Sequence, residues 1–185
     1  MRDLSLHILD LVQNCVEAGA KNIALTIVED EENDWLTFTV KDDGRGMKKE
    51  FLEQVRSPFT TSRTTRKVGL GLPLIDMSTK MSGGKLEIFS EENKGTSVNA
   101  SYRYSHIDRP PLGDILTTVK IIVISYQQIF FHYEHRKNGK EFILDTKQMR
   151  EILGESIDFG EGDIRQWLED YLKQGLSELD SKVEG

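Results

Sequence analysis

The feature that most constrains the fold is a set of short segments in which apolar side chains alternate with polar ones. In WLTFTVKD, Leu36 and Val40 fall on the same side of a strand as Phe38. Asp42 ends this row, because side chains in a strand point to the same side at every second residue. In the segment 96–102, Thr96 ends a second apolar row in the same way. Strands of this kind bury one face of a sheet and predict a layer of helices on that face.

The other segments of the first half complete this picture. Residues 3–18 and 70–81 place apolar side chains at helical spacing, and a strand around residues 23–27 follows the first helix. Residues 47–68 have little periodicity, and we expect them to form a loop. The order helix, two strands, loop, helix, two strands predicts an α+β fold. The expected architecture is a two-layer α/β sandwich, with a mixed, mostly antiparallel sheet and a helix layer on one face.

A turn-rich connector divides the chain at Asp108-Arg-Pro-Pro-Leu-Gly113. We therefore expect one domain over residues 1–107 and a small C-terminal appendage over residues 108–185. The appendage has the predicted order αββαα. Its first helix begins after Asp114, which is a suitable cap, and runs to about Gln127.

The rest of the appendage contains a hairpin and two short helices. Asn138-Gly139 between two apolar segments is a strong signal for the hairpin turn. The last helix has an apolar stripe around Trp167, which is typical of a core or an interface. Two arrangements stay open, in which the appendage either packs on its own domain or forms a homodimer interface.

Charge and composition exclude several functional classes. The 185 residues carry a formal net charge of −7 at pH 7, which argues against a general nucleic-acid binder, because such a protein needs a basic face. No apolar run reaches the roughly 18 residues that span a bilayer, and the N-terminus lacks the pattern of a signal peptide. The single cysteine, Cys15, excludes an internal disulfide. We expect a cytoplasmic protein that contacts neither nucleic acid nor a membrane.

The helix predicted at residues 3–18 also has a polar face. Its members are spaced i, i+4, i+7, i+11 and i+14, so that they share an arc of roughly 80°. They are Asp3, His7, Asp10, Asn14 and Glu17. On most helices such a stripe is only a solvated surface. Here it is followed along the chain by two glycine-rich motifs.

These motifs are DDGRGM (Asp42–Met47) and GLGL (Gly69–Leu72), and Gly95-Thr96 follows them. Each motif alone also fits a tight turn or a helix start. Their order after the polar stripe resembles the four conserved boxes of the GHKL superfamily, the Bergerat-fold ATPases that include histidine kinases, gyrase-type ATPases and mismatch-repair ATPases. LVQNCVEAGA is similar to the mismatch-repair form, and FTTSRTTRKVGLGLPLIDMSTKMSGGKLEI is similar to the histidine-kinase form. The resemblance covers roughly residues 1–103.

The resemblance implies an adenine-binding role for the motifs at the strand ends. Asp42 matches the residue that accepts a hydrogen bond from the adenine amino group, and Thr96 matches the hydroxyl that supports it directly or through water. Gly44 and Gly46 would let the backbone lie flat against the base, where a Cβ atom would clash. The alternative for Asp42 is an aspartate that caps a turn.

A second part of the resemblance implies contacts with the phosphates of ATP. Backbone N–H groups at the start of the helix at 70–81 favour phosphate oxygens through hydrogen bonds and the helix dipole. Basic side chains just before this helix could close over the triphosphate as a lid, although a solvated basic loop is an equally good reading. The predicted nucleotide contacts are Lys67, Gly69, Leu70 and Gly71, with Arg63 and Arg66 as further lid cations.

The polar stripe acquires roles from the same resemblance. Asn14 matches the asparagine that binds Mg²⁺, a hard ion that prefers oxygen ligands and keeps several waters while it bridges phosphates. Asp10 lies one turn earlier, where hydrolysing relatives have a glutamate general base, so that aspartate places the carboxylate one methylene further back. Glu17 resembles the mismatch-repair form and could act through a metal-bound water. His7 is expected to be a structural partner rather than a phosphoacceptor.

Three functions fit this set of residues. The first is a stand-alone cytoplasmic kinase or phosphotransferase that acts on a separate protein, because Met1 lies almost at the first box and leaves no room for the helical phosphoacceptor segment of a sensor kinase. The second is a slow ATPase that acts as a conformational switch. The third is a non-catalytic, nucleotide-gated adaptor for a protein partner. All three share ATP and Mg²⁺ as ligands, and the first is preferred.

Overall fold

The computed structural model describes residues 3–56 and 71–181, and these residues form one six-stranded sheet with the order β3-β4-β2-β1-β5-β6. The neighbouring strands pair antiparallel except β1 and β5, which are parallel. The predicted mixed, mostly antiparallel sheet is therefore confirmed. The strands are β1 (Asn22–Asp30), β2 (Trp35–Asp42), β3 (Lys85–Glu91), β4 (Gly95–Arg103), β5 (Phe130–Lys137) and β6 (Lys140–Asp145).

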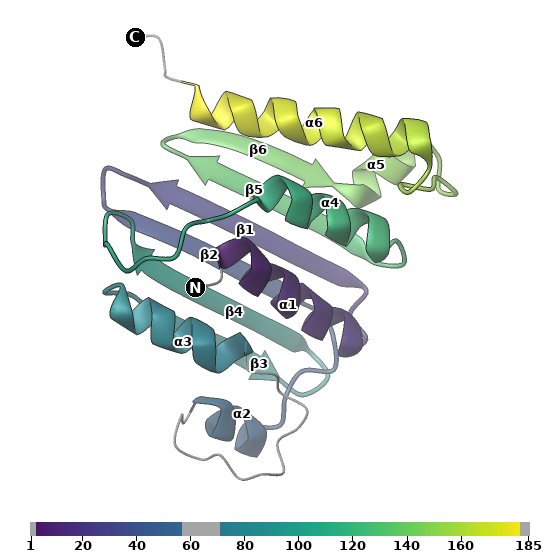
Figure 1. Ribbon diagram of the computed structural model, residues 1–185. Helices are drawn as coiled ribbons and strands as arrows, with labels where there is room; N and C mark the ends of the chain where they lie inside the picture. The colour runs from purple at the N-terminus through teal and green to yellow at the C-terminus, as the bar shows by residue number, and fades with distance from the viewer. Residues whose placement is uncertain (1–2, 57–70, 182–185) are drawn as a thin grey trace.

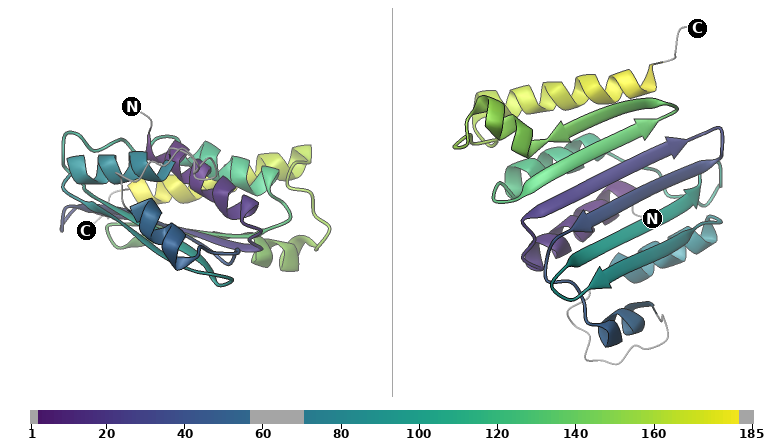
Figure 2. Two further views of the ribbon diagram at one scale, coloured as in Figure 1. Left: turned by 90° about the horizontal axis from the view of Figure 1, so that it is seen from below. Right: turned by 180° about the vertical axis from the view of Figure 1, so that it is seen from behind.

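Helices cover one face of this sheet (Figures 1 and 2), which confirms the two-layer sandwich. The helix layer consists of α1 (Leu4–Glu17), α3 (Gly71–Met81), α4 (Ile115–Ser125) and α6 (Gly162–Asp180). The shorter helix α5 (Thr146–Leu153) begins directly after β6. None of the helices among the described residues is long and apolar enough to cross a membrane.

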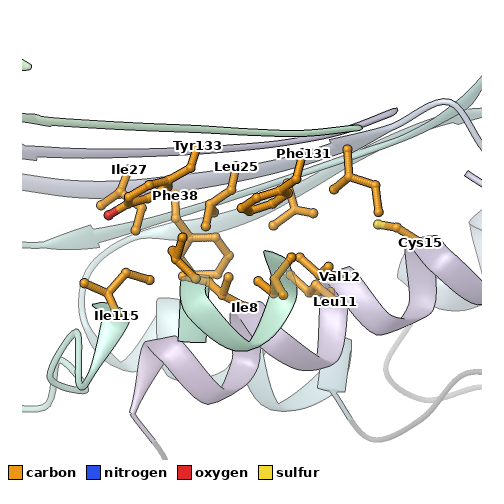
Figure 3. Packing of buried hydrophobic residues seen from close by; sticks show 14 of the residues in the cluster. Ile8, Leu11, Val12, Cys15, Leu25, Ile27, Phe38, Ile115, Phe131 and Tyr133 are labelled. Atoms are coloured by element: carbon orange, nitrogen blue, oxygen red, sulfur yellow. The ribbon is translucent and has the colours of Figure 1, made fainter. Parts of the chain in front are cut away.

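Helix α1 lies at the centre of the helix layer. Asp3 caps it, since its Oδ1 atom accepts hydrogen bonds from the Leu6 N–H at 3.1 Å and the Ser5 hydroxyl at 2.7 Å. Figure 3 shows its apolar side chains pointing at the sheet. The helix ends before Gly19, which has a φ of 77° that L residues rarely adopt. Burial of each large apolar side chain contributes about 1.5–3 kcal/mol, so that this face fixes the rotation of α1.

The stretch 47–68, predicted as a loop, contains the helix α2 (Lys49–Arg56) within its described part. This prediction was wrong for those eight residues. Leu52 is buried on one side of the short helix, and the Arg56 guanidinium donates to the Ile88 carbonyl of edge strand β3. Such a short amphipathic helix depends on tertiary contacts more than on propensity, and its two turns are too few to show a clear period.

The C-terminal segment has the predicted order αββαα, with Asp114 accepting a hydrogen bond from the Thr117 N–H at 2.9 Å as the cap of α4. Positive φ angles at Asn138 and Gly139 form the predicted hairpin turn. The last helix, α6, has 19 residues and is longer than expected. Its Gly175 packs against the Phe142 ring, where an added Cβ would lie 2.1 Å from the nearest ring atom.

The C-terminal segment also shares the sheet and core of the first segment. Strand β5 pairs with β1 along its whole length, and α4 packs beside α1. Buried residues from both segments belong to one hydrophobic cluster. The division at residues 107 and 108 stays a prediction, and the contacts join the two parts through a continuous sheet.

A chain of buried polar groups crosses the junction of β1 and β5. The Tyr133 hydroxyl lies 2.7 Å from His135 Nδ1, and His135 Nε2 lies 2.7 Å from Glu29 Oε1. Lys137 Nζ lies 3.9 Å from Glu29 and 2.7 Å from Asp180 at the end of α6. The network thus links the core of the sheet to the last helix.

Candidate nucleotide site

A cavity of about 540 Å³ lies where α1, the ends of β2 and β4 and the start of α3 meet. Four residues predicted to bind the nucleotide or its metal line this cavity, although they come from three separate parts of the chain. They are Asn14, Asp42, Gly46 and Thr96. The walls are mainly apolar, and their apolar side chains include Leu11, Val40, Met47, Phe51, Leu72 and Val98. A concave, mostly apolar pocket with a few convergent polar groups suits an aromatic base.

Asp42 is the last residue of β2, and its side chain lies on the buried side of the strand, as the period of two predicts. Asp42 is buried, with only 8% of the residue exposed. Its Oδ1 atom accepts a hydrogen bond from the Gly44 N–H at 2.7 Å. Thr96 is its direct neighbour on β4. The two side chains that end the two apolar rows therefore lie side by side at the cavity. A carboxylate at this position needs a partner, because an unpaired buried charge is costly.

Ser90 is a polar neighbour that the sequence analysis did not identify. Its Oγ atom lies 2.8 Å from Thr96 Oγ1 and accepts a hydrogen bond from the Met47 N–H at 2.9 Å. It also donates to the Gly95 carbonyl at 3.1 Å. Ser90 thus joins β3, β4 and the glycine-rich segment. The same period of two would have found it, since Ser90 continues the inward row of Leu86 and Ile88.

Close contacts within the protein explain the glycines of the DDGRGM motif and also Gly95. Gly46 has a φ of 64°, and an added Cβ would lie 2.0 Å from the Glu91 carbonyl oxygen. Gly95 has a φ of 107°, and its Cβ would lie 2.0 Å from the Asp42 carbonyl oxygen. At Gly44 a Cβ would approach backbone and side-chain atoms at 2.9 Å. The three backbone segments approach so closely that side chains other than hydrogen do not fit at Gly46 and Gly95.

Only some residues of the polar stripe of α1 line the cavity. Asn14 and Glu17 line it, whereas Asp10 and His7 do not belong to its lining. Asp10 is half-buried one turn before Asn14, and His7 is buried at 4% exposure. The structure therefore brings Asn14 and Glu17 to the cavity, whereas Asp10 is not part of its lining.

Cys15 is a further residue of the lining that the sequence analysis did not assign to the site. It is buried at the end of the apolar face of α1 (Figure 3). Burial first, and then the charge of Asp42 and a hydrogen bond to it, raise the pKa of the Cys15 thiol. The thiol therefore stays protonated, so that it is a weak nucleophile and can act as a donor towards Asp42.

The glycine-rich helix start is described only in part. Gly71 is the first residue of α3, with open space around its Cα, and the next residue, Leu72, lines the cavity. The predicted contacts Lys67, Gly69 and Leu70, and the lid cations Arg63 and Arg66, lie outside the described residues. Their roles stay predictions.

The lining of the cavity also includes polar and charged residues that the sequence analysis did not single out. They are Arg45, Lys48, Glu92 and Asn93. Lys48 Nζ lies 3.9 Å from Glu92 in a largely exposed ion pair, which stabilises the fold by little. The Asn93 N–H donates to the Arg45 carbonyl at 2.6 Å, so that the β3–β4 turn closes over the glycine-rich segment.

The comparison with known families fits this geometry. The sequence model of the family "Histidine kinase-, DNA gyrase B-, and HSP90-like ATPase" matches residues 2–105, which contain every residue predicted for the site. The chain belongs to this family. Membership supports ATP binding, and it confirms the resemblance on which the predicted roles depend.

Proteins of similar sequence include a sporulation kinase and a phage-resistance protein. Sporulation kinase C of Bacillus subtilis is 34% identical over 88 residues, which are 48% of this chain and 20% of that kinase. The Non-motile and phage-resistance protein of Caulobacter vibrioides is 31% identical over 111 residues, which are 55% of this chain and 13% of that protein. The chain thus spans a fifth or less of these relatives.

A likeness in structure extends further along the chain. A crystal structure of the N-terminal domain of a DNA repair protein superimposes with a TM-score of 0.55 and 18% identity, over 78% of this chain and 53% of that chain. At this identity the likeness shows the fold alone. Its coverage is larger than that of the family match, so part of the segment after residue 105 also has a counterpart there.

Proposed function

We propose that this protein binds Mg-ATP in the cavity and transfers the γ-phosphate to a separate protein, as a cytoplasmic kinase or phosphotransferase. The observation that carries the proposal is the convergence of Asn14, Asp42 and Thr96 on one 540 Å³ cavity in a member of this ATPase family. The similarity of part of the chain to Sporulation kinase C favours phosphate transfer over hydrolysis. The single, buried cysteine suits a reducing compartment.

Each residue of the cavity has a role in this proposal. Asp42 accepts the hydrogen bond from the adenine amino group, and Thr96 supports it with a hydroxyl that Ser90 orients. The apolar walls contact the two faces of the base. Gly71, the first residue of α3, offers its N–H group to the phosphates. Gly69 and Leu70, outside the described residues, are further predicted phosphate contacts, and Lys67 is the cation predicted to neutralise the phosphates.

The residues of the cavity fit Mg²⁺ as a partner of the nucleotide. The described residues contain no group of three or more His, Cys, Asp or Glu side chains that could hold a metal by themselves. Asn14 offers one neutral oxygen at the cavity, and phosphates and waters would supply the remaining ligands that Mg²⁺ prefers. When bound, the ion would neutralise charge on the phosphates.

A second candidate is a slow ATPase that acts as a conformational switch. Glu17 favours it, because this carboxylate lines the cavity beside Asn14 and could orient a water molecule, as in the mismatch-repair form of the motif. Asp10 is the general base predicted for either reaction. From its place outside the cavity lining, Asp10 would act only after the segments around it rearrange on nucleotide binding.

One experiment separates these functions. The protein is incubated with Mg²⁺ and ATP labelled at the γ-phosphate, in the presence of candidate protein partners. Label on a protein supports the kinase, free phosphate supports the ATPase, and label that stays on the nucleotide supports the adaptor. Asp10→Asn should abolish the reaction that occurs, and an ATPase as fast as wild type in this variant would remove Asp10 from the mechanism.

Nucleotide binding is tested separately from the reaction. Asn14→Ala should abolish Mg²⁺-dependent ATP binding in calorimetry, because it removes the metal ligand. Gln166→Ala, which removes an exposed amide from the distant helix α6, is the matched control and should bind as wild type. Binding by Asn14→Ala that is unchanged and still Mg²⁺-dependent would contradict the proposed metal site.

A further inference from the structure

Asp43 is the second aspartate of the DDGRGM motif, and its side chain has a different environment from that of Asp42. Asp43 is exposed and does not line the cavity. Its Oδ1 atom accepts hydrogen bonds from the backbone N–H groups of Lys21 at 2.8 Å and Asn22 at 2.9 Å. Its Oδ2 atom accepts a third from the Asn22 side-chain amide at 2.8 Å. The carboxylate thus holds the start of β1 with both oxygens.

These contacts connect the glycine-rich segment to three other parts of the fold. The Asp43 N–H donates to the Asn22 carbonyl at 3.3 Å, and the Lys21 carbonyl accepts from Phe130, the first residue of β5, at 2.8 Å. One residue beyond Gly44, the Arg45 N–H donates to Ala18, the C-cap of α1, at 2.9 Å. The segment that follows Asp42 is therefore tied to α1, β1 and β5 by a continuous set of hydrogen bonds.

The charge of Asp43 is stabilised by the same contacts. Burial raises the pKa of its carboxyl group, but hydrogen bonds from the Asn22 backbone, the Asn22 side chain and Lys21 outweigh this effect, so that the pKa is lowered. Asp43 is thus ionised at neutral pH. Hydrogen bonds to an ionised acceptor are stronger than those between neutral groups.

We propose that Asp43 is a positioning residue for adenine recognition, which holds the end of β2 so that the Asp42 carboxylate points at the amino group of the base. The inference rests on the proposed ATP site. Asp42 is the last residue of β2, and the chain leaves the strand immediately after it. A carboxylate there discriminates between bases only if its direction is fixed, since hydrogen bonds weaken steeply with angle. Asp43 supplies that restraint from outside the cavity.

A purely structural role is the competing explanation, and the chain offers a matched control for it. Asp30, at the opposite end of β1, makes the same kind of contacts with an asparagine. Its Oδ1 atom accepts from the Asn33 N–H at 3.0 Å and its Oδ2 atom from the Asn33 side-chain amide at 2.8 Å. Asp30 does not line the nucleotide cavity. Asp30→Ala therefore removes a similar set of hydrogen bonds without any connection to Asp42.

The experiment compares the affinities for ATP and for inosine triphosphate, which has an oxygen where adenine has its amino group. Calorimetry gives the ratio of the two Kd values for wild type, Asp43→Ala and Asp30→Ala. In Asp43→Ala the preference for ATP should fall by at least about tenfold, a factor that corresponds to about 1.4 kcal/mol. In Asp30→Ala it should be unchanged. Asn22→Ala, which removes one of the three hydrogen bonds, is a milder variant in case Asp43→Ala does not fold, and it should lower the preference by less.

A rescue variant tests the geometry itself. Asn22→Asp alone places two carboxylates in contact and should weaken the preference for ATP. Combined with Asp43→Asn, it restores a donor and an acceptor in exchanged positions, and the preference should return to within about threefold of wild type, or less than about 1 kcal/mol. The inference fails if Asp43→Ala keeps its preference, if both nucleotides weaken equally, or if Asp30→Ala loses it too. A wild-type protein that binds no ATP, or that does not prefer it, refutes the proposed function instead.

Discussion

The Tyr133–His135–Glu29 chain can be tested by removing a single atom. Tyr133→Phe deletes the hydroxyl that lies 2.7 Å from His135 Nδ1 and leaves the rest of the ring in place. Burial first, and then the charge of Glu29, raise the pKa of Tyr133, so that the hydroxyl is protonated and donates. We assign the ring proton of His135 to Nε2, which then donates to Glu29, because Nδ1 accepts from Tyr133 in this arrangement. The variant therefore leaves a buried acceptor without its donor.

The expected cost follows from the burial of His135, which is 3% exposed. A buried polar atom that loses its partner costs about 1–3 kcal/mol in desolvation. For a chain of this length each kcal/mol lowers Tm by about 2–4 °C, so that Tm should fall by about 2–12 °C. The unfolding midpoint in urea should fall without a change in slope, because the surface exposed on unfolding is the same.

Tyr102→Phe is the control in the same core. Tyr102 is also fully buried, and burial raises its pKa to about 12 against the opposing effect of its hydrogen bond with Ser78. Its hydroxyl lies 3.2 Å from Ser78 Oγ, and Ser78 Oγ donates to the Ile75 carbonyl at 3.0 Å. Ser78 therefore keeps a partner, and the loss should stay near the 0.5–1.5 kcal/mol of an ordinary hydrogen bond. The reasoning is refuted if Tyr133→Phe costs less than about 0.5 kcal/mol or no more than Tyr102→Phe.

Three further predictions concern other parts of the molecule. Gly46→Ala should lose ATP binding and lower Tm, because the φ of Gly46 is 64° and the new methyl group would lie 2.0 Å from the Glu91 carbonyl oxygen. Gly139→Ala is the control for backbone strain alone, since Gly139 has a similar φ but open space around it. Asp42→Asn should weaken ATP relative to inosine triphosphate in calorimetry, since the amide can turn a donor towards the adenine amino group, and an unchanged ratio would contradict the assigned role. Burial raises the pKa of Asp145, but hydrogen bonds from His132 and the start of α5 outweigh it and lower the pKa. The stability that Asp145 contributes is then present above its unfolded pKa of about 3.9 and is lost as the pH falls through the lower folded pKa. The free energy of unfolding in urea should therefore be lower for Asp145→Asn than for wild type at pH 7. This difference between the two proteins should shrink in acid.

Much of the fold was predictable because the inward rows of the strands are long and regular. The alternation in β2 and β4 predicted the buried face of the sheet and the place of Asp42 and Thr96 at its end. The segment order predicted the helix layer. Helix α2 was missed because two helical turns carry too few apolar residues for a period, and its position depends on contacts such as that of Arg56 with β3.

Pairing between distant strands was not predictable from local patterns. The hairpin signal at Asn138-Gly139 joins β5 to β6, but nothing in the local sequence states that β5 lies beside β1. That pairing decides where the C-terminal segment sits, and it brings Glu29 and His135 into contact from positions 106 residues apart. In the sequence both look like ordinary polar residues on a strand, whereas in the structure they share a buried hydrogen bond.

In the candidate site, too, local sequence patterns predict the direction of each side chain, but only the pairing of distant strands brings the side chains together. Asp42, Thr96 and Ser90 end three inward rows, so the period of two applies to each of them, and only the strand order β3-β4-β2 makes them neighbours. The need for glycine at two positions also depends on contacts between distant segments. Gly46 and Gly95 are required because the backbone of the β3–β4 turn approaches the backbone at and after the end of β2 too closely for a Cβ atom. A motif that is weak in the sequence, such as DDGRGM, therefore becomes specific through the segments it contacts. Asp43 extends this argument, because its two oxygens act on β1 while its neighbour faces the cavity.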